Sequence, residues 1–345
     1  MNHFNVIAID LAKNSFQVCK TDHRGHVIFN RSMSRQKLKE LLIKEKQSLV
    51  AMESCGGTHY WAQYAVKHGH KVKAMSARHV KAFRQGQKTD ANDALAISIA
   101  CLQPNIKPCR LLKVEEQCEQ GVMRIRELLI EQRIQISNQL QTLMLEFGLP
   151  VAKGDKALRE TISLALEDAE NSFSFYFRFS LNQLYERYKS LDDQVDELQT
   201  QLNAMTKNDR ICKRLQALEG VGPVCAMLLK IALNQVGHFS KGRDAAACIG
   251  VTPVQHSTGG KQKIGSISKY SAHNTLRSAL YQGSLSVVSK IEKKEAHTHK
   301  DVWLKELVAR RGMKRAAIAL ANKTVRTAFA LIAKDENYQP QLLEA

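Results

Sequence analysis

The chain has 345 residues, 44% of them hydrophobic and 24% charged. These values exclude wholesale disorder and a fibrous repeat, and the length predicts two or three globular units. Lys and Arg number 51 against 33 Asp and Glu, and the resulting net charge of +18 favours a polyanionic partner over a small metabolite. From residue 235 onward, 18 cations stand against 8 acidic residues. A merely solubilising surface is the alternative explanation.

The sequence carries no sign of membrane insertion or export. No run approaches the 18 to 20 apolar residues of a membrane span, and the N-terminal apolar run from Phe4 ends at Asp10. The eight cysteines are scattered singly, without a C-x-x-C pair or a spacing with histidine that suits a metal. We therefore expect a cytoplasmic protein with reduced thiols and no membrane partner.

The first hundred residues alternate between strand and helix patterns. Three β-rich segments predict an antiparallel meander at residues 4–10, 15–20 and 26–29. Helix, strand, helix and strand then follow at residues 35–45, 48–52, 58–67 and 71–75, and a further helix is expected at 90–102. This order predicts an α/β domain.

The middle of the chain is helical. Residues 114–147 lack proline and repeat apolar residues at a helical spacing, and a shorter helix is expected after Pro150. Heptad positions then run without interruption from Leu181 to Met205, which predicts a coiled coil. Its partner is either a second copy of the chain, in a homodimer, or the earlier long helix of the same chain.

After Asn208 short helices are separated by glycines. The stretch containing Gly220 and Gly222 precedes an apolar run and resembles a helix-hairpin-helix. In such a hairpin, glycines let backbone N–H groups approach a phosphate of nucleic acid. A structural turn between two packed helices is the alternative.

Four carboxylates fall at the ends of expected elements. Asp10 and Glu53 end strands, and Asp90 and Asp93 begin a helix, three residues apart and therefore on one face. A carboxylate that ends a buried strand is costly unless it pairs or coordinates. Hard oxygen ligands suit Mg²⁺, and two such ions could support phosphoryl transfer. Structural alternatives are a turn role for Asp10, helix N-cap roles for Glu53 and Asp90, and a favourable dipole interaction for Asp93.

A second constellation spans residues 255–261, Gln-His-Ser-Thr-Gly-Gly-Lys. Ser257, beside two glycines and near cations, is a candidate nucleophile toward phosphate. The same composition is common in ordinary loops, and the adjacent His256 need not face the serine. A nucleotide-triphosphate site after Asp10 is unlikely on physical grounds, because the following residues, Leu-Ala-Lys-Asn, contain no glycine.

Together these motifs resemble one family along nearly the whole chain. They are, in order, IAIDLAKN, AMESCGGTHYW, KTDANDA, LEGVGPVCAMLL and ACIGVTPVQHSTGGKQKIGSISKYSAHNTLRSALY. In this order they resemble the DEDD/serine transposases of bacterial insertion sequences, whose kin include the Piv-type DNA invertases. The QHS-x-GGK stretch is similar to the subgroup typified by the Coxiella insertion sequence.

The resemblance implies a domain plan and two sites. The implied domains are a RuvC-like domain of RNase H fold at 1–110, long helices and a coiled coil at 111–208, a mainly helical transposase domain with the helix-hairpin-helix-like motif at 209–330, and a tail at 331–345. By likeness Asp10, Glu53, Asp90 and Asp93 would hold Mg²⁺, and Ser257 would be the nucleophile. Some relatives have further serines where this chain has Thr-Gly-Gly, which makes Thr258 the second candidate.

The resemblance further implies a transposase that exchanges DNA strands under the guidance of a structured noncoding RNA, as a homo-oligomer, dimeric or tetrameric on DNA. Base pairing would then choose the sequence. The candidate phosphate contacts near the serine are Lys261, Lys263, Lys269 and Arg277. The alternatives are a junction-resolving nuclease that uses the carboxylates alone and a non-catalytic nucleic-acid-binding regulator.

Overall fold

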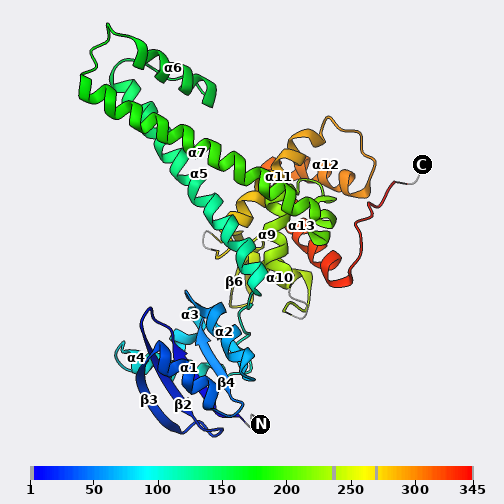
Figure 1. The fold of residues 1–345 in the computed structure, drawn as a ribbon. Helices are drawn as coiled ribbons and strands as arrows, with labels where there is room; N and C mark the ends of the chain where they lie inside the picture. The colour runs from blue at the N-terminus through cyan, green and yellow to red at the C-terminus, as the bar shows by residue number, and fades with distance from the viewer. Residues whose placement is uncertain (1–3, 235–237, 269–270, 344–345) are drawn as a thin grey trace. The chain divides into compact units, whose positions relative to one another are not determined.

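The computed structural model describes residues 4–234, 238–268 and 271–343. Its contacts divide the chain into an N-terminal unit, residues 1–117, and a C-terminal unit, residues 118–345. Figure 1 shows the course of the chain through both units. The mixed α/β class expected from the sequence is confirmed.

The N-terminal unit is built on a five-stranded sheet in the order β3-β2-β1-β4-β5. The strands are β1 (Val6–Asp10), β2 (Ser15–Thr21), β3 (Val27–Ser34), β4 (Leu49–Glu53) and β5 (Lys71–Met75). The first three form the predicted antiparallel meander, and β4 and β5 run parallel to β1. Because β1 and β4 are parallel neighbours, their C-terminal ends lie at the same edge of the sheet.

Helices cover both faces of this sheet. They are α1 (Arg35–Lys44), α2 (Thr58–Lys67), α3 (Ala77–Val80), the 3-10 turn η1 (Lys81–Phe83) and α4 (Asp90–Cys101). Alternate residues of β1 enter different cores: Ile7 and Ile9 pack with α1 and α2, and Val6 and Ala8 pack with Ile97 of α4. This alternation is the period-two pattern of a strand buried on both faces.

The long helices of the C-terminal unit are α5 (Val114–Glu146), which begins at the end of the N-terminal unit, and α7 (Phe175–Asn208). Within the C-terminal unit they lie along each other in opposite directions (Figure 1): Arg126 binds Gln199, and Arg133 pairs with Asp192. The shorter α6 (Asp155–Glu167) packs on both.

The heptad positions of α7 are buried or half-buried within this chain. Leu181 and Tyr188 pack with Leu140 of α5, and Leu202 shares a core with Met123. The observed packing therefore favours the intramolecular partner for the heptads, while the coiled coil and the homodimer stay predictions.

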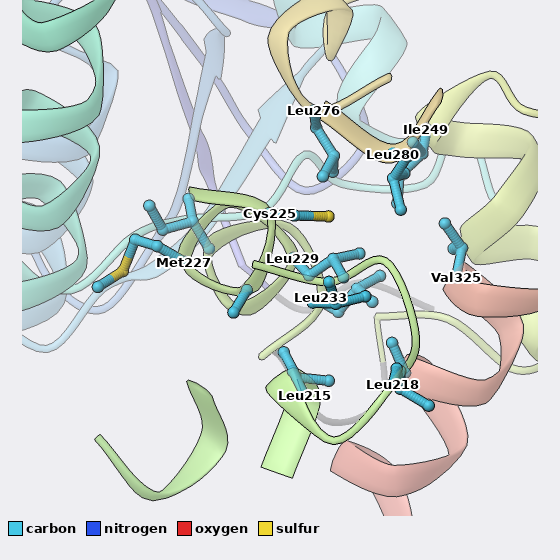
Figure 2. Packing of buried hydrophobic residues seen from close by; sticks show 14 of the residues in the cluster. Leu215, Leu218, Cys225, Met227, Leu229, Leu233, Ile249, Leu276, Leu280 and Val325 are labelled. Carbon is cyan, nitrogen blue, oxygen red and sulfur yellow. The ribbon is translucent and has the colours of Figure 1, made fainter. Parts of the chain in front are cut away.

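Six further helices and a hairpin complete the C-terminal unit. They are α8 (Arg210–Gln216), α9 (Pro223–Leu233), α10 (Gly242–Ile249), β6 (Pro253–Thr258), β7 (Lys261–Ile267), α11 (Asn274–Ile291), α12 (His299–Arg311) and α13 (Met313–Lys334). Helix α9 is apolar on nearly all sides because it lies at the centre of the core. Leu229 of α9 and Leu280 of α11 belong to this cluster (Figure 2).

The turn before α9 is held by a close approach of two backbones. Gly220 has φ of +76°, and a Cβ at this position would lie 2.6 Å from the carbonyl oxygen of Gly283 in α11. Only glycine satisfies both demands. The structure thus gives Gly220 a packing role, in line with the structural alternative, and Gly222 is the exposed N-cap of α9.

Among the described residues one helix, α13, is long and apolar enough to cross a membrane by length and composition. Half of its apolar window is buried within the protein. Val325 and Ala328 on its inner face belong to the core formed with α9, α10 and α11. Packing inside the C-terminal unit therefore accounts for the apolar character of α13.

Candidate catalytic sites

Two of the predicted carboxylates lie at neighbouring strand ends. Asp10 is the last residue of β1 and Glu53 the last of β4, and the parallel register pairs Ile9 with Met52 just before them. Both side chains are half-buried, whereas the four residues of β1 before Asp10 are fully buried. The sheet therefore holds two carboxylates at one edge, on strands whose positions are set by the core.

Helix α4 supplies the other two carboxylates. Asp90 and Asp93 lie in its first turn, and the helix is capped by Thr89, whose hydroxyl accepts from the backbone N–H of Asn92. Asp90 is therefore the first helical residue and not the N-cap. The N-cap of α2 is Gly57 and not Glu53, so both capping interpretations of these acids were wrong.

The pKa shifts of Asp10 and Glu53 show that the four carboxylates lie near one another. Burial, followed by repulsion from Asp93, Asp90 and Glu53, raises the pKa of Asp10 to about 6, although Lys88 opposes the shift. Burial and repulsion from Asp93 also raise the pKa of Glu53. Asp10 thus lies close enough to Asp93, Asp90 and Glu53 for their charges to disfavour its ionisation, as expected where several acids share one site.

Cations near this cluster were not singled out from the sequence. Arg84 lies 3.2 Å from the carboxylate of Asp93, between Nη1 and Oδ1, and Lys88 lowers the pKa values of Asp10 and Glu53. Both belong to the segment between η1 and α4. Arg84 and Lys88 come near the carboxylates only because α4 packs against β1, so no local signal in the sequence identified them.

The cluster has the donor chemistry for a hard cation. Its groups are carboxylate oxygens, which Mg²⁺ prefers in proteins, and a dication would relieve the repulsion that raises the pKa of Asp10. As the side chains stand, no three acidic, His or Cys groups of the described residues converge closely enough to hold a metal ion. For these acids to hold a cation together, their carboxylates would have to move from the positions that they occupy.

Ser257 lies on a hairpin that the sequence analysis did not predict. It belongs to β6, which pairs with β7 across the two-residue turn Gly259-Gly260. Both glycines have positive φ, +55° and +80°, as a type I′ turn requires. The Gly-Gly pair between residues that pair across strands was the signal that could have revealed it.

The pairing register divides the hairpin into two faces. Ser257 lies opposite Gln262, and Gln255, which donates to the Ser257 hydroxyl at 3.3 Å, lies opposite Ile264. Residues that pair directly or lie two apart share a face, so these four side chains form what we call the serine face.

The other face carries the lysines. His256 lies opposite Lys263, and Thr258 lies opposite Lys261. Because strand residues alternate, Lys261 and Lys263 accompany Thr258 and not Ser257. All of these side chains are exposed. Lys269, the third predicted phosphate contact, lies outside the described residues.

Arg277 has a structural partner. It lies on α11, and its Nη2 donates to the carbonyl oxygen of Ser268, just after β7, at 2.7 Å. Its Nε and Nη1 are buried without a partner in the part of the chain that the structure describes. Arg277 therefore supports the base of the hairpin, and its two other donors are buried away from solvent.

Basic residues are not confined to the C-terminal third. The N-terminal unit has 19 Lys and Arg against 9 Asp and Glu, also an excess of ten. The excess of positive charge from residue 235 onward, also ten, is therefore matched by an equal excess in the N-terminal unit. A polyanion has favourable charge on both units.

The chain thus combines an α/β unit that carries a cluster of carboxylates with a helical unit that is rich in Lys and Arg. Two family models match it: a transposase model, DEDD_Tnp_IS110, over residues 7–148, and the transposase IS116/IS110/IS902 family over residues 212–300. The chain is 32% identical over 339 residues to the transposase for insertion sequence element IS1111A of Coxiella burnetii, covering 98% of this chain and 92% of the relative.

A second relative, the transposase for insertion sequence element IS1328 of Yersinia enterocolitica, is 30% identical over 331 residues, or 96% of this chain and 97% of the relative. The chain belongs to the IS110/IS116 family of insertion-sequence transposases. The match over residues 7–148 includes all four carboxylates, and the match over residues 212–300 includes Ser257.

Proposed function

We propose that this chain is a DNA recombinase that moves its own insertion sequence by serine-linked strand exchange. The observation that carries the proposal is the cluster of four carboxylates at the ends of β1 and β4 and the start of α4, in which Asp10 is repelled by the other three. Such a cluster has little structural benefit without a cation, and family membership makes DNA the expected substrate.

In this proposal Asp10, Glu53, Asp90 and Asp93 hold Mg²⁺. When bound, the metal supplies charge stabilisation for a phosphodiester undergoing displacement. The protein's own part is to keep the strand ends and α4 fixed through their buried cores, so that the carboxylates need only side-chain rotation. We expect the metal to bind metal-free protein with release of a proton from Asp10 near pH 6.

Ser257 is the proposed nucleophile. Its Oγ forms a bond to phosphorus while the bond from phosphorus to one deoxyribose oxygen breaks, and the proton lost by the serine is matched by one gained by the released sugar hydroxyl. The phosphoserine link retains the energy of the broken phosphodiester, so rejoining needs no ATP. Exposure of Ser257 on β6 supports this role because DNA must reach the hydroxyl.

We further propose that a structured noncoding RNA pairs with donor and target DNA, and that the active form is a cytoplasmic homo-oligomer. The positive charge on both units supports two polyanionic partners. An exposed aromatic group at the start of α7 supports self-association: Phe175 is 77% exposed and Tyr176 81%.

The test is to express the protein with its element's flanks and a target plasmid, denature the lysate in SDS and look for covalently attached DNA. We expect an adduct that maps to Ser257 and is lost in Ser257→Ala and Glu53→Gln. Glu40→Gln, which changes an acid on α1 of the same unit, is the matched control and should retain the adduct.

Three results would contradict the proposal. DNA cut without an adduct, and still cut by Ser257→Ala, would identify a nuclease that uses the carboxylates alone. An adduct that maps to Thr258 would move the nucleophile by one residue. Binding without any cleavage in every variant would indicate a regulator.

A further inference from the structure

A groove of about 1810 Å³ crosses the C-terminal unit. It is bounded by α10, the base of the β6–β7 hairpin, α12 and α13. Seven Lys and Arg line it, and none of the described lining residues is Asp or Glu. The whole chain has 51 Lys and Arg against 33 Asp and Glu, so the charged residues of the groove are far more one-sided than those of the chain. Such a lining favours binding of an anion.

The cations lie on the rim and repel one another. Arg315, Lys323 and Arg326 are exposed on α13 at spacings near a helical period, and Lys241 and Arg243 are exposed at the start of α10. Burial and repulsion from Lys300 and Arg326 lower the pKa of Lys323. A bound polyanion would relieve this repulsion.

The floor of the groove is apolar. Ile318, Ala319 and Ala330 of α13 form part of it, together with Phe329 and with Trp303 of α12. A DNA duplex presents phosphates and sugar edges to a protein, so an apolar floor would contribute little to its binding. An unpaired strand places bases on apolar and aromatic surfaces while its phosphates meet cations at the sides.

The groove continues onto the serine face of the hairpin. Pro253, Ile264 and Ile267 line it, and the register pairs Pro253 with Ile267 and Gln255 with Ile264. Ile264 therefore shares the face of Ser257, which lies two residues beyond Gln255, whereas the register shifts between Gln255 and Pro253. Lys261 and Lys263 lie on the opposite face.

We propose that this groove binds an unpaired nucleic-acid strand, with bases on the apolar floor and phosphates at the rim, and leads it along the hairpin toward Ser257. The destination of the strand rests on the proposed function, whereas binding in the groove does not. The shared chemistry is the phosphodiester backbone with exposed bases, which DNA and RNA both supply.

The test measures binding of labelled oligonucleotides of one sequence, as single-stranded DNA, single-stranded RNA and duplex DNA, over a range of salt. The variant is Arg315→Glu with Arg326→Glu, and the matched control is Arg310→Glu with Lys314→Glu, exposed cations of α12 and α13 that do not line the groove. We expect the groove variant to lose at least about tenfold in single-strand affinity and to reduce the salt slope by about 1.4. The control should bind within about twofold of wild type.

A second variant, Trp303→Leu, keeps the charge and most of the apolar volume. It should weaken single-strand binding by about fivefold or more, with duplex binding unchanged. Tighter binding of RNA or of DNA single strands assigns the groove to that strand. Equal losses in the groove and control variants, or tighter binding of duplex by wild type, would overturn the inference.

The measurement separates the two proposals. If no adduct forms with any protein while the groove variant still loses binding, the recombinase chemistry fails and the groove stands.

Discussion

The two units present their candidate residues in opposite ways. In the N-terminal unit Asp10 and Glu53 end strands that are buried on both faces, so their backbone positions are fixed by the core. In the C-terminal unit Ser257 lies on an exposed two-stranded hairpin that is attached to a helical core only at its base. A metal site needs fixed ligands, whereas a nucleophile on an isolated hairpin depends on a partner for its final position.

The helical core of the C-terminal unit, where α11 approaches the turn before α9, is the first place to test this contrast. Gly283→Ala should destabilise the C-terminal unit by at least about 3 kcal/mol, because the new methyl group would overlap the carbonyl of Gly220. Chemical denaturation with far-UV circular dichroism measures this. Gly121→Ala in α5, also in a helix but with no atom within 4 Å of the added Cβ, should stabilise by about 0.5–1 kcal/mol. Similar effects of both substitutions would show that the approach of α11 to the α9 turn is not tight.

The hairpin turn tests whether the geometry of Ser257 depends on strand pairing. Gly260→Ala places a side chain at φ of +80° and should reduce adduct formation about tenfold through misplacement of the serine, with little change in Tm. Gly259→Asn creates the Asn-Gly pair that type I′ turns favour and should retain activity. Full activity of Gly260→Ala would mean that bound nucleic acid, and not the turn, sets the position of Ser257.

The acidic cluster should make the stability of the metal-free protein depend on pH. The folded pKa of Asp10, about 6, lies above its ordinary value of 3.8, so its contribution favours folding below pH 4 and is lost as the pH rises through 6. Asp10→Asn removes this loss of stability, because the amide does not ionise. At pH 7.5 it should stabilise the metal-free protein by about 1 kcal/mol, a figure discounted because the carboxyl is only partly buried.

Thermal unfolding at pH 4 and pH 7.5, with and without Mg²⁺, checks this prediction. The gain from Asp10→Asn should vanish at pH 4, and Mg²⁺ should raise the Tm of wild type more than that of the variant. A variant that is less stable than wild type at pH 7.5 would identify Asp10 as a structural turn residue.

The smallest effect is expected on the lysine face of the hairpin. Lys263→Ala should change single-strand affinity by less than about threefold, because Lys263 lies with His256, away from Ser257 and from the groove. Fluorescence anisotropy at fixed salt is sufficient. A loss as large as that of the groove variant would restore Lys263 as a phosphate contact and place the nucleic acid across both faces.

The N-terminal unit could be predicted almost entirely from the sequence. Its strands and helices alternate in type, and each has its own local pattern, so the predicted spans agree with β1, β2, β4 and β5 and with α1, α2 and α4 to within about two residues, whereas the strand predicted at 26–29 continues to Ser34 in β3. The four carboxylates stood out because polar residues at the ends of apolar runs are a local signal. That they share one edge needed only the parallel pairing of β1 with β4.

The C-terminal unit was harder to predict from the sequence. The sequence did not predict the β6–β7 hairpin, because all its side chains except Ile267 are exposed and the two strands therefore lack an apolar alternation. The groove cations Arg315 and Arg326 gave no local signal either, since ordinary exposed helices carry the same residues.

By itself, the amino-acid sequence determined the elements, the acidic ends of the strands and the excess of positive charge, because propensity, periodicity and composition act over a few residues. Only the tertiary structure decided which residues meet. Packing of α4 on the sheet brings Asp93 to Asp10, and the strand register places Ser257 on the same face of the hairpin as Ile264, which lines the groove, and Lys261 and Lys263 on the other face. These outcomes depend on contacts between residues distant in the chain, where burial and strand register act and local pattern carries no information.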